Sequence, residues 1–376
     1  MANVKNLLAE LIALPSVNPA FLPPRHPQAG EGRVAEYLAA LGARAGLDIA
    51  FQPVLPHRPN LLACLRPVGR VRRTILLAPH LDTVNAARAD QFTPRTQGGR
   101  LFGRGACDTK GSVAAFFAAL CDLARSGARP RETEIVFVGL VDEEQGQSGS
   151  RFLADLKFKA DFAIVGEPTR LALATAHKGS VWLTVETRGR AAHGATPWFG
   201  KSAVHAMARV VEALETDFAA RLRRRRHPLL GHGSVSVGTI AGGTQTNIVP
   251  DHCVISVDRR TLPGESEAAT RREVAAFLRA RKLAAKVANV KLKPCFPLET
   301  EPNLPFVRQF LRRLGQARPA GLHYFCDAAV LARGGIPSVV FGPGDIAQAH
   351  TADEWISIAQ LERARESLLG FLKSLP

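Results

Sequence analysis

The stretch 135-IVFVGLVDEEQGQSGS-150 joins a run of apolar residues to two adjacent glutamates, Glu143 and Glu144. A short, continuous apolar run bounded by turn residues is typical of a strand that is buried on both faces of a sheet. Two like charges at the end of such a strand repel each other, and the repulsion reduces stability. We therefore expect other charged groups to converge on this strand end and to offset the pair.

The segments around this strand alternate between strand and helix patterns. The predicted strands are residues 61–65, 74–77, 134–141 and 162–165, and the predicted helices are residues 113–124 and 149–156. This alternation favours an α/β domain with a mixed, mostly parallel sheet flanked by helices. In such sheets, active sites collect at the carboxyl ends of the strands.

The pattern changes near Lys178. The segment 180-SVWLTVETRG-189 alternates apolar and polar residues, as a half-buried antiparallel strand does. A helix, two strands and a second helix are then predicted at residues 203–214, 234–240, 253–260 and 267–281. This β-α-β-β-α order indicates an α+β, ferredoxin-like domain of residues 178–290, inserted into an α/β domain of residues 1–177 and 291–376. The α/β domain resumes with a strand at 338–341 and a final helix from about residue 358.

The bulk composition excludes several classes of protein. A chain of 376 residues is longer than a domain with a single hydrophobic core usually is, so two domains are expected. Its 46% of hydrophobic residues are enough to form a core in each domain. No apolar run approaches the roughly 20 residues that span a membrane, and the N-terminal segment resembles an amphipathic helix rather than a signal peptide. Six scattered cysteines without a CxxC pair favour a reducing cytoplasm over a disulfide framework.

The formal net charge of +16 is the one unusual bulk property. Such a charge can steer anionic substrates or bind nucleic acid. However, most of the basic residues are arginines in a chain that is also rich in alanine, glycine and proline, and this composition favours arginines on solvated faces. We expect the four-arginine run at 223–226 to be a solvated helix end or loop, and we expect no nucleic-acid partner.

Histidines and acidic residues gather in five short segments. These are 78-APHLDTV-84, 103-GRGACDTKGS-112, 141-VDEEQGQSGS-150, 164-IVGEPT-169 and 348-QAHTADE-354. Each segment alone is more often structural, as a turn or a helix cap. Together they supply two histidines and at least four carboxylates, which is about what two metal ions with one bridging carboxylate need.

The pair His80 and Asp82 has a spacing that suits a metal site. In an extended segment, residues i and i+2 face the same side. Asp82 can therefore hydrogen-bond one ring nitrogen of His80 while the other nitrogen binds metal. An HxD pair on its own is also compatible with a turn histidine beside a capping aspartate.

In the order and spacing of its motifs, the chain resembles the acetylornithine deacetylase / succinyl-diaminopimelate desuccinylase / carboxypeptidase G family of dizinc hydrolases. The resemblance covers essentially the whole chain, and the last segment is most similar to the acetylornithine deacetylase branch. The further segments that carry it are 14-LPSVNP-19, 191-AAHGATPWFG-200, 244-TQTNIVPD-251, 258-DRRTLPGE-265 and 342-GPGDIAQAHTADE-354.

The resemblance implies a ligand set for two zinc ions, with cobalt or manganese as alternatives. The implied ligands are His80 and Glu167 for the first metal, Glu144 and His350 for the second, and Asp108 as the bridge. It also implies that Asp82 orients His80. Glu143 is implied as the general base that deprotonates the attacking water.

The resemblance also assigns residues in the inserted domain. This domain is expected to form a homodimer and to act as a lid. His193 is expected to reach the partner copy's site and to stabilise the tetrahedral oxyanion. Asn247 and Arg259 match substrate-contacting positions, and the guanidinium of Arg259 suits a bidentate grip on a carboxylate.

The implied activity is hydrolysis of the amide bond of a small N-acyl amino acid. The first expectation is the conversion of N-acetyl-L-ornithine and water to L-ornithine and acetate. The alternatives are a succinyl-diaminopimelate desuccinylase and a metallo-carboxypeptidase or dipeptidase on the same scaffold. A non-catalytic, basic binding protein is the alternative from a different functional class. It is disfavoured, because a residue able to bind metal stands at every implied ligand position.

Overall fold

The computed structural model describes residues 3–290 and 293–376, which divide into two units. Unit 1 comprises Met1–Thr175, Thr300–Ala320 and Cys326–Pro376, and unit 2 comprises Ala176–Glu299 and Gly321–Phe325. The sequence places the first domain boundary at Lys178, and the units change at Ala176. The predicted second boundary, at Lys291, lies outside the described residues.

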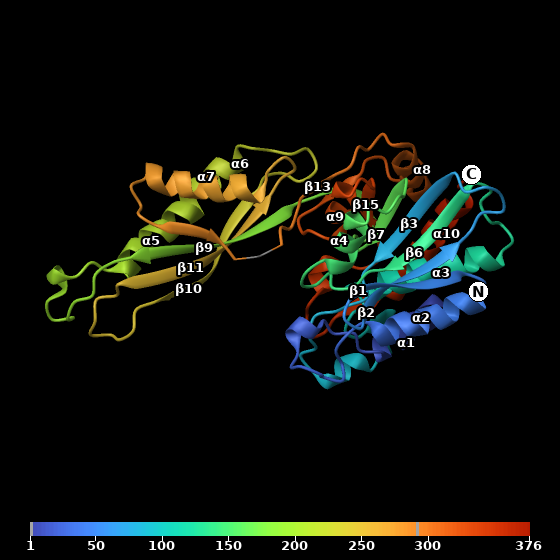
Figure 1. The fold of residues 1–376 in the computed structure, drawn as a ribbon, viewed down its shortest axis with the longest axis horizontal. Helices are drawn as coiled ribbons and strands as arrows, with labels where there is room; N and C mark the ends of the chain where they lie inside the picture. Colours follow the sequence, from blue (N-terminus) through green and yellow to red (C-terminus); the bar gives the residue numbers. More distant parts are fainter. Residues whose placement is uncertain (1–2, 291–292) are drawn as a thin grey trace. The chain divides into compact units, whose positions relative to one another are not determined.

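Unit 1 is built on the large sheet seen in Figure 1. Its strands, in spatial order, are β1 (Asp48–Leu55), β2 (Arg58–Leu65), β6 (Thr133–Gly139), β3 (Arg73–Pro79), β7 (Phe162–Gly166), β15 (Ser338–Phe341) and β8 (Ala174–His177). The last two residues of β8 belong to unit 2, where they pair with β13 (Leu298–Glu299), and β14 (Ala320–Leu322) also pairs with β8. Strands β6, β3, β7 and β15 are parallel, and the pairs on either side of them are antiparallel. The predicted mixed sheet with a parallel centre is confirmed.

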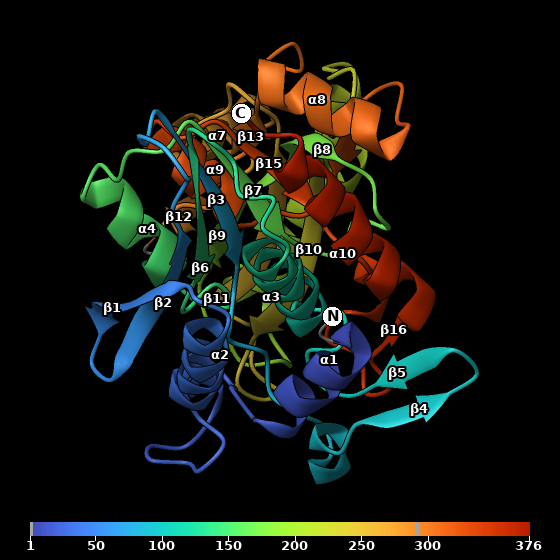
Figure 2. The same ribbon diagram turned by 90° about the vertical axis from the view of Figure 1, so that its right-hand side faces the viewer.

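Helices cover both faces of this sheet, as the end-on view in Figure 2 shows. One face carries α1 (Val4–Ala13), α2 (Gly32–Arg44), α3 (Lys110–Arg125), α8 (Pro305–Leu314) and α10 (Ile358–Lys373). On the other face, α4 (Ser148–Asp155) packs against α9 (Asp327–Arg333), which contacts β7 and β15. Because both faces are covered, β7 and β15 are buried at every residue, and their sequences do not alternate.

Helix α3 crosses the centre of the unit 1 core. It is buried from Lys110 to Leu123, and its Phe117 meets Phe137 of β6 edge to face. A small separate sheet of β4 (Arg95–Gln97), β5 (Arg100–Phe102) and β16 (Trp355–Ser357) lies in the same unit. This sheet brings the chain just before α3 beside the chain just before α10, because β5 pairs with β16.

Unit 2 contains an antiparallel sheet in the order β10 (Ser234–Gly242), β11 (His252–Thr261), β9 (Gly179–Arg188) and β12 (Lys286–Asn289). The unit also contains the helices α5 (Ala203–Ala213), α6 (Ala219–Arg223) and α7 (Glu267–Ala280). A π-helical turn (Leu214–Phe218) joins α5 to α6. Residues of β11 alternate between buried and half-buried, as expected when one face of the sheet carries the core. The predicted strand and helix order is present, with β12 and α6 added.

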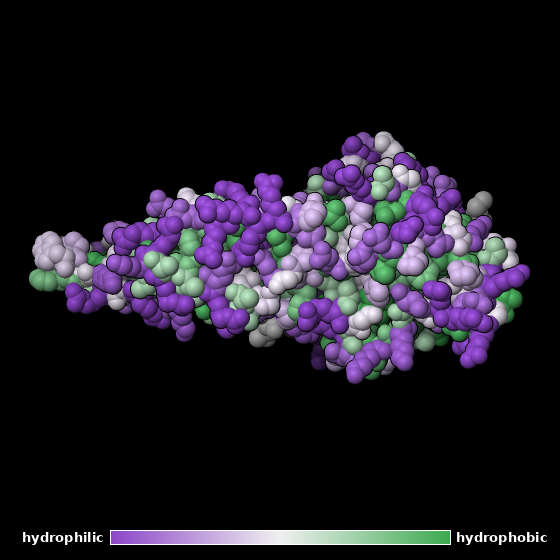
Figure 3. Space-filling view, turned by 90° about the horizontal axis from the view of Figure 1, so that it is seen from above, coloured by the Kyte–Doolittle hydropathy of each residue, from purple (hydrophilic) through white to green (hydrophobic). Residues whose placement is uncertain are grey.

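The surface that faces the viewer in Figure 3 is mostly hydrophilic, and apolar residues are scattered over it. The arginine run at 223–226 is exposed and begins at the last residue of α6, as predicted for a solvated helix end. No helix in residues 3–290 and 293–376 has the length and apolar composition needed to cross a membrane.

Candidate metal centre and active site

The ends of three neighbouring strands position the acidic residues of unit 1. His80 follows β3, Glu144 follows β6 and Glu167 follows β7. Because β6, β3 and β7 are adjacent and parallel, the residues after their carboxyl ends reach the same edge of the sheet. Two further segments complete the cluster: His350 lies in the connection after β15, and Asp108 lies two residues before α3.

Asp108 lies between the two histidines. Its Oδ1 is 3.2 Å from His80 Nε2, and its Oδ2 is 3.2 Å from His350 Nε2. His350 Nε2 is also 3.2 Å from Glu144 Oε2, and His80 Nε2 is 3.9 Å from Glu167 Oε1. The structure therefore brings together all five residues that the sequence predicts as metal ligands.

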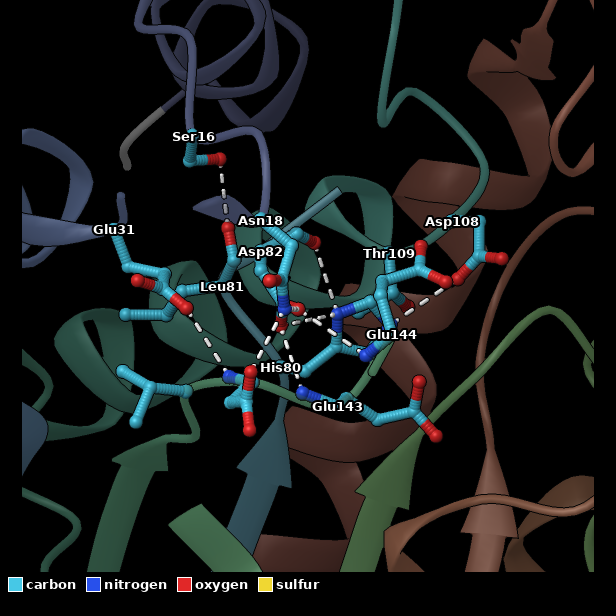
Figure 4. Close-up of polar contacts among 12 residues, drawn as sticks. Ser16, Asn18, Glu31, His80, Leu81, Asp82, Asp108, Thr109, Glu143 and Glu144 are labelled. Atoms are coloured by element: carbon cyan, nitrogen blue, oxygen red, sulfur yellow. Dashed lines mark hydrogen bonds and ion pairs between the residues drawn. The ribbon is translucent and has the colours of Figure 1, made fainter. Parts of the chain in front are cut away.

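Asp82 holds both His80 and the glutamate pair. His80 Nδ1 is 3.0 Å from the backbone carbonyl of Asp82 and 3.4 Å from its carboxylate, so the carbonyl is the nearer acceptor. The Asp82 carboxylate accepts the backbone N–H groups of Glu143 and Glu144 at 3.0 and 3.1 Å, and the side-chain amide of Asn18 at 2.8 Å. Figure 4 shows these contacts meeting at Asp82. With Nδ1–H donated to Asp82, Nε2 of His80 is left to face Asp108.

The turn that carries the glutamate pair has a second support. Asp142 has a positive φ of 68°, and its carbonyl accepts the N–H of Gly146 at 3.0 Å, which closes the turn. Its carboxylate accepts Ser148 Oγ at 2.5 Å and Arg58 Nη2 at 3.2 Å. Arg58 in turn donates two hydrogen bonds of 2.7 Å to the buried carboxylate of Glu31. None of these supporting residues has a predicted role.

Burial and charge together shift the pKa values of the cluster. Burial raises the pKa values of Glu143 and Glu167 well above the usual range, and it raises that of Glu144 to about 7. Although burial alone would lower it, hydrogen bonding to Asp108 and Asp82 raises the pKa of His80 well above its usual value. Hydrogen bonds to Asp108 and Glu144 raise the pKa of His350 to about 10. In this cluster, protonated groups offset a concentration of buried negative charge.

The donor set fits divalent metal ions. Histidine nitrogens and carboxylate oxygens are ligands that zinc takes from proteins. His80, Asp108 and Glu144 each offer a ligand atom within 4.8 Å of the others. In the part of the chain that the structure describes, Glu144 Oε1 is buried without a hydrogen-bond partner. A cation would satisfy this oxygen, and Asp108, with one oxygen toward each histidine, has the arrangement of a bridging ligand.

Asp327, the first residue of α9, adds another buried carboxylate to this region. Its Oδ1 accepts Ser150 Oγ at 2.5 Å, whereas its Oδ2 is buried and has no hydrogen-bond partner among the described residues. Burial raises the pKa of Asp327 to about 6, and the charges of His80 and Asp82 also act on it. An aspartate at the start of a helix is common, because it interacts favourably with the helix dipole. The sequence position of Asp327 therefore does not indicate that it lies near the cluster.

The three residues predicted in unit 2 differ from the cluster in unit 1. His193 and Asn247 are both exposed. They lie close together, since the N–H of Gly194 donates to the Asn247 carbonyl at 2.7 Å. Arg259 is buried, and its Nη2 contacts both oxygens of Glu265 at 3.1 and 2.9 Å. The guanidinium thus grips a carboxylate of its own chain, and its role toward substrate stays a prediction.

Comparison with known proteins relates these observations to a family. Residues 76–374 match the sequence model of peptidase family M20/M25/M40. The chain is 32% identical over 350 residues to an acetylornithine deacetylase of Myxococcus xanthus, with 89% of each protein covered. It is similar in structure to a tripeptidase of Staphylococcus aureus, with a TM-score of 0.80, 21% identity and coverage of 99% of this chain and 97% of that chain. It is also similar to a dinuclear metal-binding peptidase of Bacillus subtilis, with a TM-score of 0.69, 13% identity and coverage of 98% and 96%.

Proposed function

The chain belongs to peptidase family M20/M25/M40, and from this premise we propose that it is a dizinc deacylase that hydrolyses N-acetyl-L-ornithine to L-ornithine and acetate. The observation that carries the proposal is Asp108, which faces His80 with one carboxylate oxygen and His350 with the other. The relative from Myxococcus xanthus supports the deacetylase reaction over other reactions of metallohydrolases in this family.

The proposed metal ligands are those that the structure brings together. His80 and Glu167 would hold one ion, Glu144 and His350 the other, and Asp108 would bridge them. When bound, such ions supply Lewis acidity, which makes an attacking water more acidic and a substrate carbonyl more electrophilic. Zinc is the proposed metal, and cobalt or manganese suits the same nitrogen and oxygen donors.

Glu143 is proposed as the general base. Its backbone N–H is fixed on Asp82 at 3.0 Å, which anchors the residue next to Glu144 while its side chain stays available. The carboxylate takes the proton of the attacking water and then delivers it to the leaving amine. Positive charge in the site favours the ionised form of Glu143, against the burial that raises its pKa.

Unit 2 is proposed to supply the remaining contacts from a second copy of the chain. His193 would donate a hydrogen bond to the developing oxyanion, and Asn247, which lies beside it, would contact the substrate. Exposed apolar side chains in the same unit support a homodimer: Trp198 is 70% exposed, Phe199 64% and Ile240 58%. Arg259 would bind the substrate carboxylate only after exchanging its partner Glu265.

A metallo-carboxypeptidase, a dipeptidase or a succinyl-diaminopimelate desuccinylase is the alternative. The same metal ligands and a carboxylate-binding arginine would serve these reactions as well. The cytoplasm is the proposed location, because the six cysteines, all within the described residues, are thiols rather than disulfides.

A substrate panel on metal-reconstituted protein tests the proposal. We expect the highest kcat/KM with N-acetyl-L-ornithine, and we expect a chelator to abolish the activity. N-succinyl-diaminopimelate and small dipeptides are the comparison substrates. Higher kcat/KM with a dipeptide would favour the peptidase alternative, whereas bound metal without hydrolysis of any substrate would contradict the proposal as a whole.

A further inference from the structure

Glu354 is a buried carboxylate that joins two segments of the proposed metal centre. It lies four residues after His350, in the segment 348-QAHTADE-354, and only 1% of its surface is exposed. Its partners lie in the segment 104–108, which ends at Asp108. Contacts between the two segments join residues up to 250 positions apart in the sequence.

The carboxylate of Glu354 accepts four hydrogen bonds from this segment. Oε1 accepts the backbone N–H groups of Cys107 and Asp108 at 2.8 and 2.9 Å. Oε2 accepts the backbone N–H of Gly105 at 2.9 Å and Arg104 Nη1 at 2.7 Å. These four donors all bind one side chain. The position of Glu354 therefore fixes the backbone conformation of the segment that ends at Asp108.

Contacts with main-chain carbonyls also tie the same two segments together. The N–H of Gly103 donates to the Glu354 carbonyl at 3.0 Å, and Arg104 Nη2 donates to the Thr351 carbonyl at 3.3 Å. On the far sides of these contacts, β5 pairs with β16. The segment that carries His350 and the segment that carries Asp108 are thus held as one body, with Glu354 between them.

The conformation of segment 103–108 depends on this arrangement. Gly105 has a φ of 84°, a value that L side chains rarely adopt, and this allows its N–H to point inward. Backbone N–H groups that converge form a concave site for an anion, and here those of Gly105, Cys107 and Asp108 converge on an anion of the protein itself. Without an acceptor, these buried N–H groups would each be unsatisfied.

We propose that Glu354 is a positioning residue that sets the spacing between Asp108 and His350 and thereby the affinity of the site for its second metal ion. This inference rests on the proposed function, because it assumes that these residues bind metal. Asp108 Oδ2 and His350 Nε2 are 3.2 Å apart, so both groups must keep their places if one ion is to bind between them and Glu144. Glu354 belongs to the segment of His350 and its carboxylate hydrogen-bonds the segment of Asp108, so it is suited to hold that spacing.

The test is a titration of metal-free protein with Co²⁺, followed by visible absorption and calorimetry. Glu354→Gln keeps the size of the side chain, but its NH₂ group would face donors instead of accepting from them. Loss of such a supporting contact typically weakens metal binding about 10- to 100-fold. We expect the second equivalent of Co²⁺ to bind at least about 10-fold more weakly than in the wild type, while the first equivalent changes less.

Asp122→Asn is the matched control. Asp122 is another buried carboxylate of unit 1, and its Oδ2 is 2.5 Å from Arg365 Nη1. It lies near the far end of α3, about 20 Å along the helix from Asp108 at 1.5 Å per residue. This variant should lower the Tm of the metal-free protein and leave both Co²⁺ affinities within about twofold of the wild type.

The outcomes separate the inference from the proposed function. If the wild type binds no Co²⁺, the proposed function fails. If the wild type binds two equivalents and Glu354→Gln binds both with unchanged affinity, Glu354 has no positioning role. Equal losses of affinity in Glu354→Gln and Asp122→Asn would also overturn the inference, because they would indicate general destabilisation. If Glu354→Gln does not fold, Glu354→Asp, which keeps the charge but is one methylene shorter, decides the question by the same titration.

Discussion

The residues predicted for the site in unit 1 and those predicted in unit 2 have opposite surroundings. In unit 1, Asp108, Glu144 and Glu167 are clustered and shielded from water, and their negative charges are only partly offset by histidines. In unit 2, His193 is exposed, and Arg259 already has a carboxylate partner. A cation would neutralise the first arrangement, whereas the proposed role of the second requires substrate or a second copy of the chain.

Glu143→Ala should give the largest effect, because it removes the proposed base and leaves the ligand positions intact. We expect kcat to fall about 10³-fold, within the range that general bases contribute, while two metal ions per chain remain bound. Activity assays with N-acetyl-L-ornithine and elemental analysis measure the two quantities. Glu362→Ala, at an exposed glutamate on α10, is the control and should behave as wild type. Full activity of Glu143→Ala would remove the proposed role of Glu143.

Removal of metal should destabilise unit 1 and spare unit 2. The cluster then loses the positive charge of the metal ions, and binding at a metal concentration of 1,000 Kd stabilises a protein by about 4 kcal/mol. We expect chelator-treated protein to have a lower Tm than zinc-loaded protein. Hydrogen exchange should localise the change to the loops after β3, β6 and β7. Equal melting of the two forms would argue against the metal centre.

His193→Ala should reduce kcat about 10²-fold with unchanged Tm and metal content, since it removes one donor to the oxyanion. A mixture of this variant with Glu143→Ala tests whether His193 acts across a dimer. Random exchange of subunits gives heterodimers with one intact site, so about a quarter of wild-type activity should return. If the mixture gains no activity, His193 does not serve the partner's site.

The smallest expected effect concerns His177, a buried histidine of unit 2. Burial lowers its pKa to about 4, so the folded chain resists a proton that the unfolded chain accepts below pH 6.5. Its contribution to stability is therefore complete above pH 6.5 and declines as the pH falls toward 4. At pH 5 the loss is about 2 kcal/mol, at 1.36 kcal/mol per pH unit.

The variant His177→Asn isolates this effect. Asparagine does not titrate and keeps an N–H for the Lys178 carbonyl, which lies 2.9 Å from His177 Nδ1. Urea unfolding at pH 7 and pH 5 should show a smaller loss of stability in the variant than in the wild type. The same loss in both proteins would mean that His177 is not the group that titrates.

The sequence predicted the centre of each unit better than its edges. Strands β3, β6 and β7 are continuous apolar runs, so both their existence and the placement of His80, Glu144 and Glu167 at their ends could be predicted. Strand β1 was not predicted, because it is an edge strand that contains Pro53 and has no buried residue. Helix α2 also escaped prediction: no side chain caps it, and its preceding residue, Glu31, binds Arg58 instead.

The supporting contacts of the site could not be predicted by spacing. Asp108 and Glu354 are 246 residues apart, and Asn18 and Asp142 are 124 apart. Hydrogen bonds at such separations depend on how the strands are ordered in the sheet, which local periodicity does not specify. Motif resemblance predicted the ligands, whereas the residues that hold these side chains in place became visible only in three dimensions.

The ends of the inserted segment carry a consequence for how such chains evolve. Residues 176 and 177 of β8 pair with residues 299 and 298 of β13, so the long segment of unit 2, Ala176–Glu299, begins and ends in two paired strands. A domain whose ends lie side by side can be gained or lost in one event, because a short turn can close the gap that it leaves. Chemistry and assembly can therefore diverge separately: the strand-end cluster can be kept while the module that would carry partner recognition is exchanged as a block.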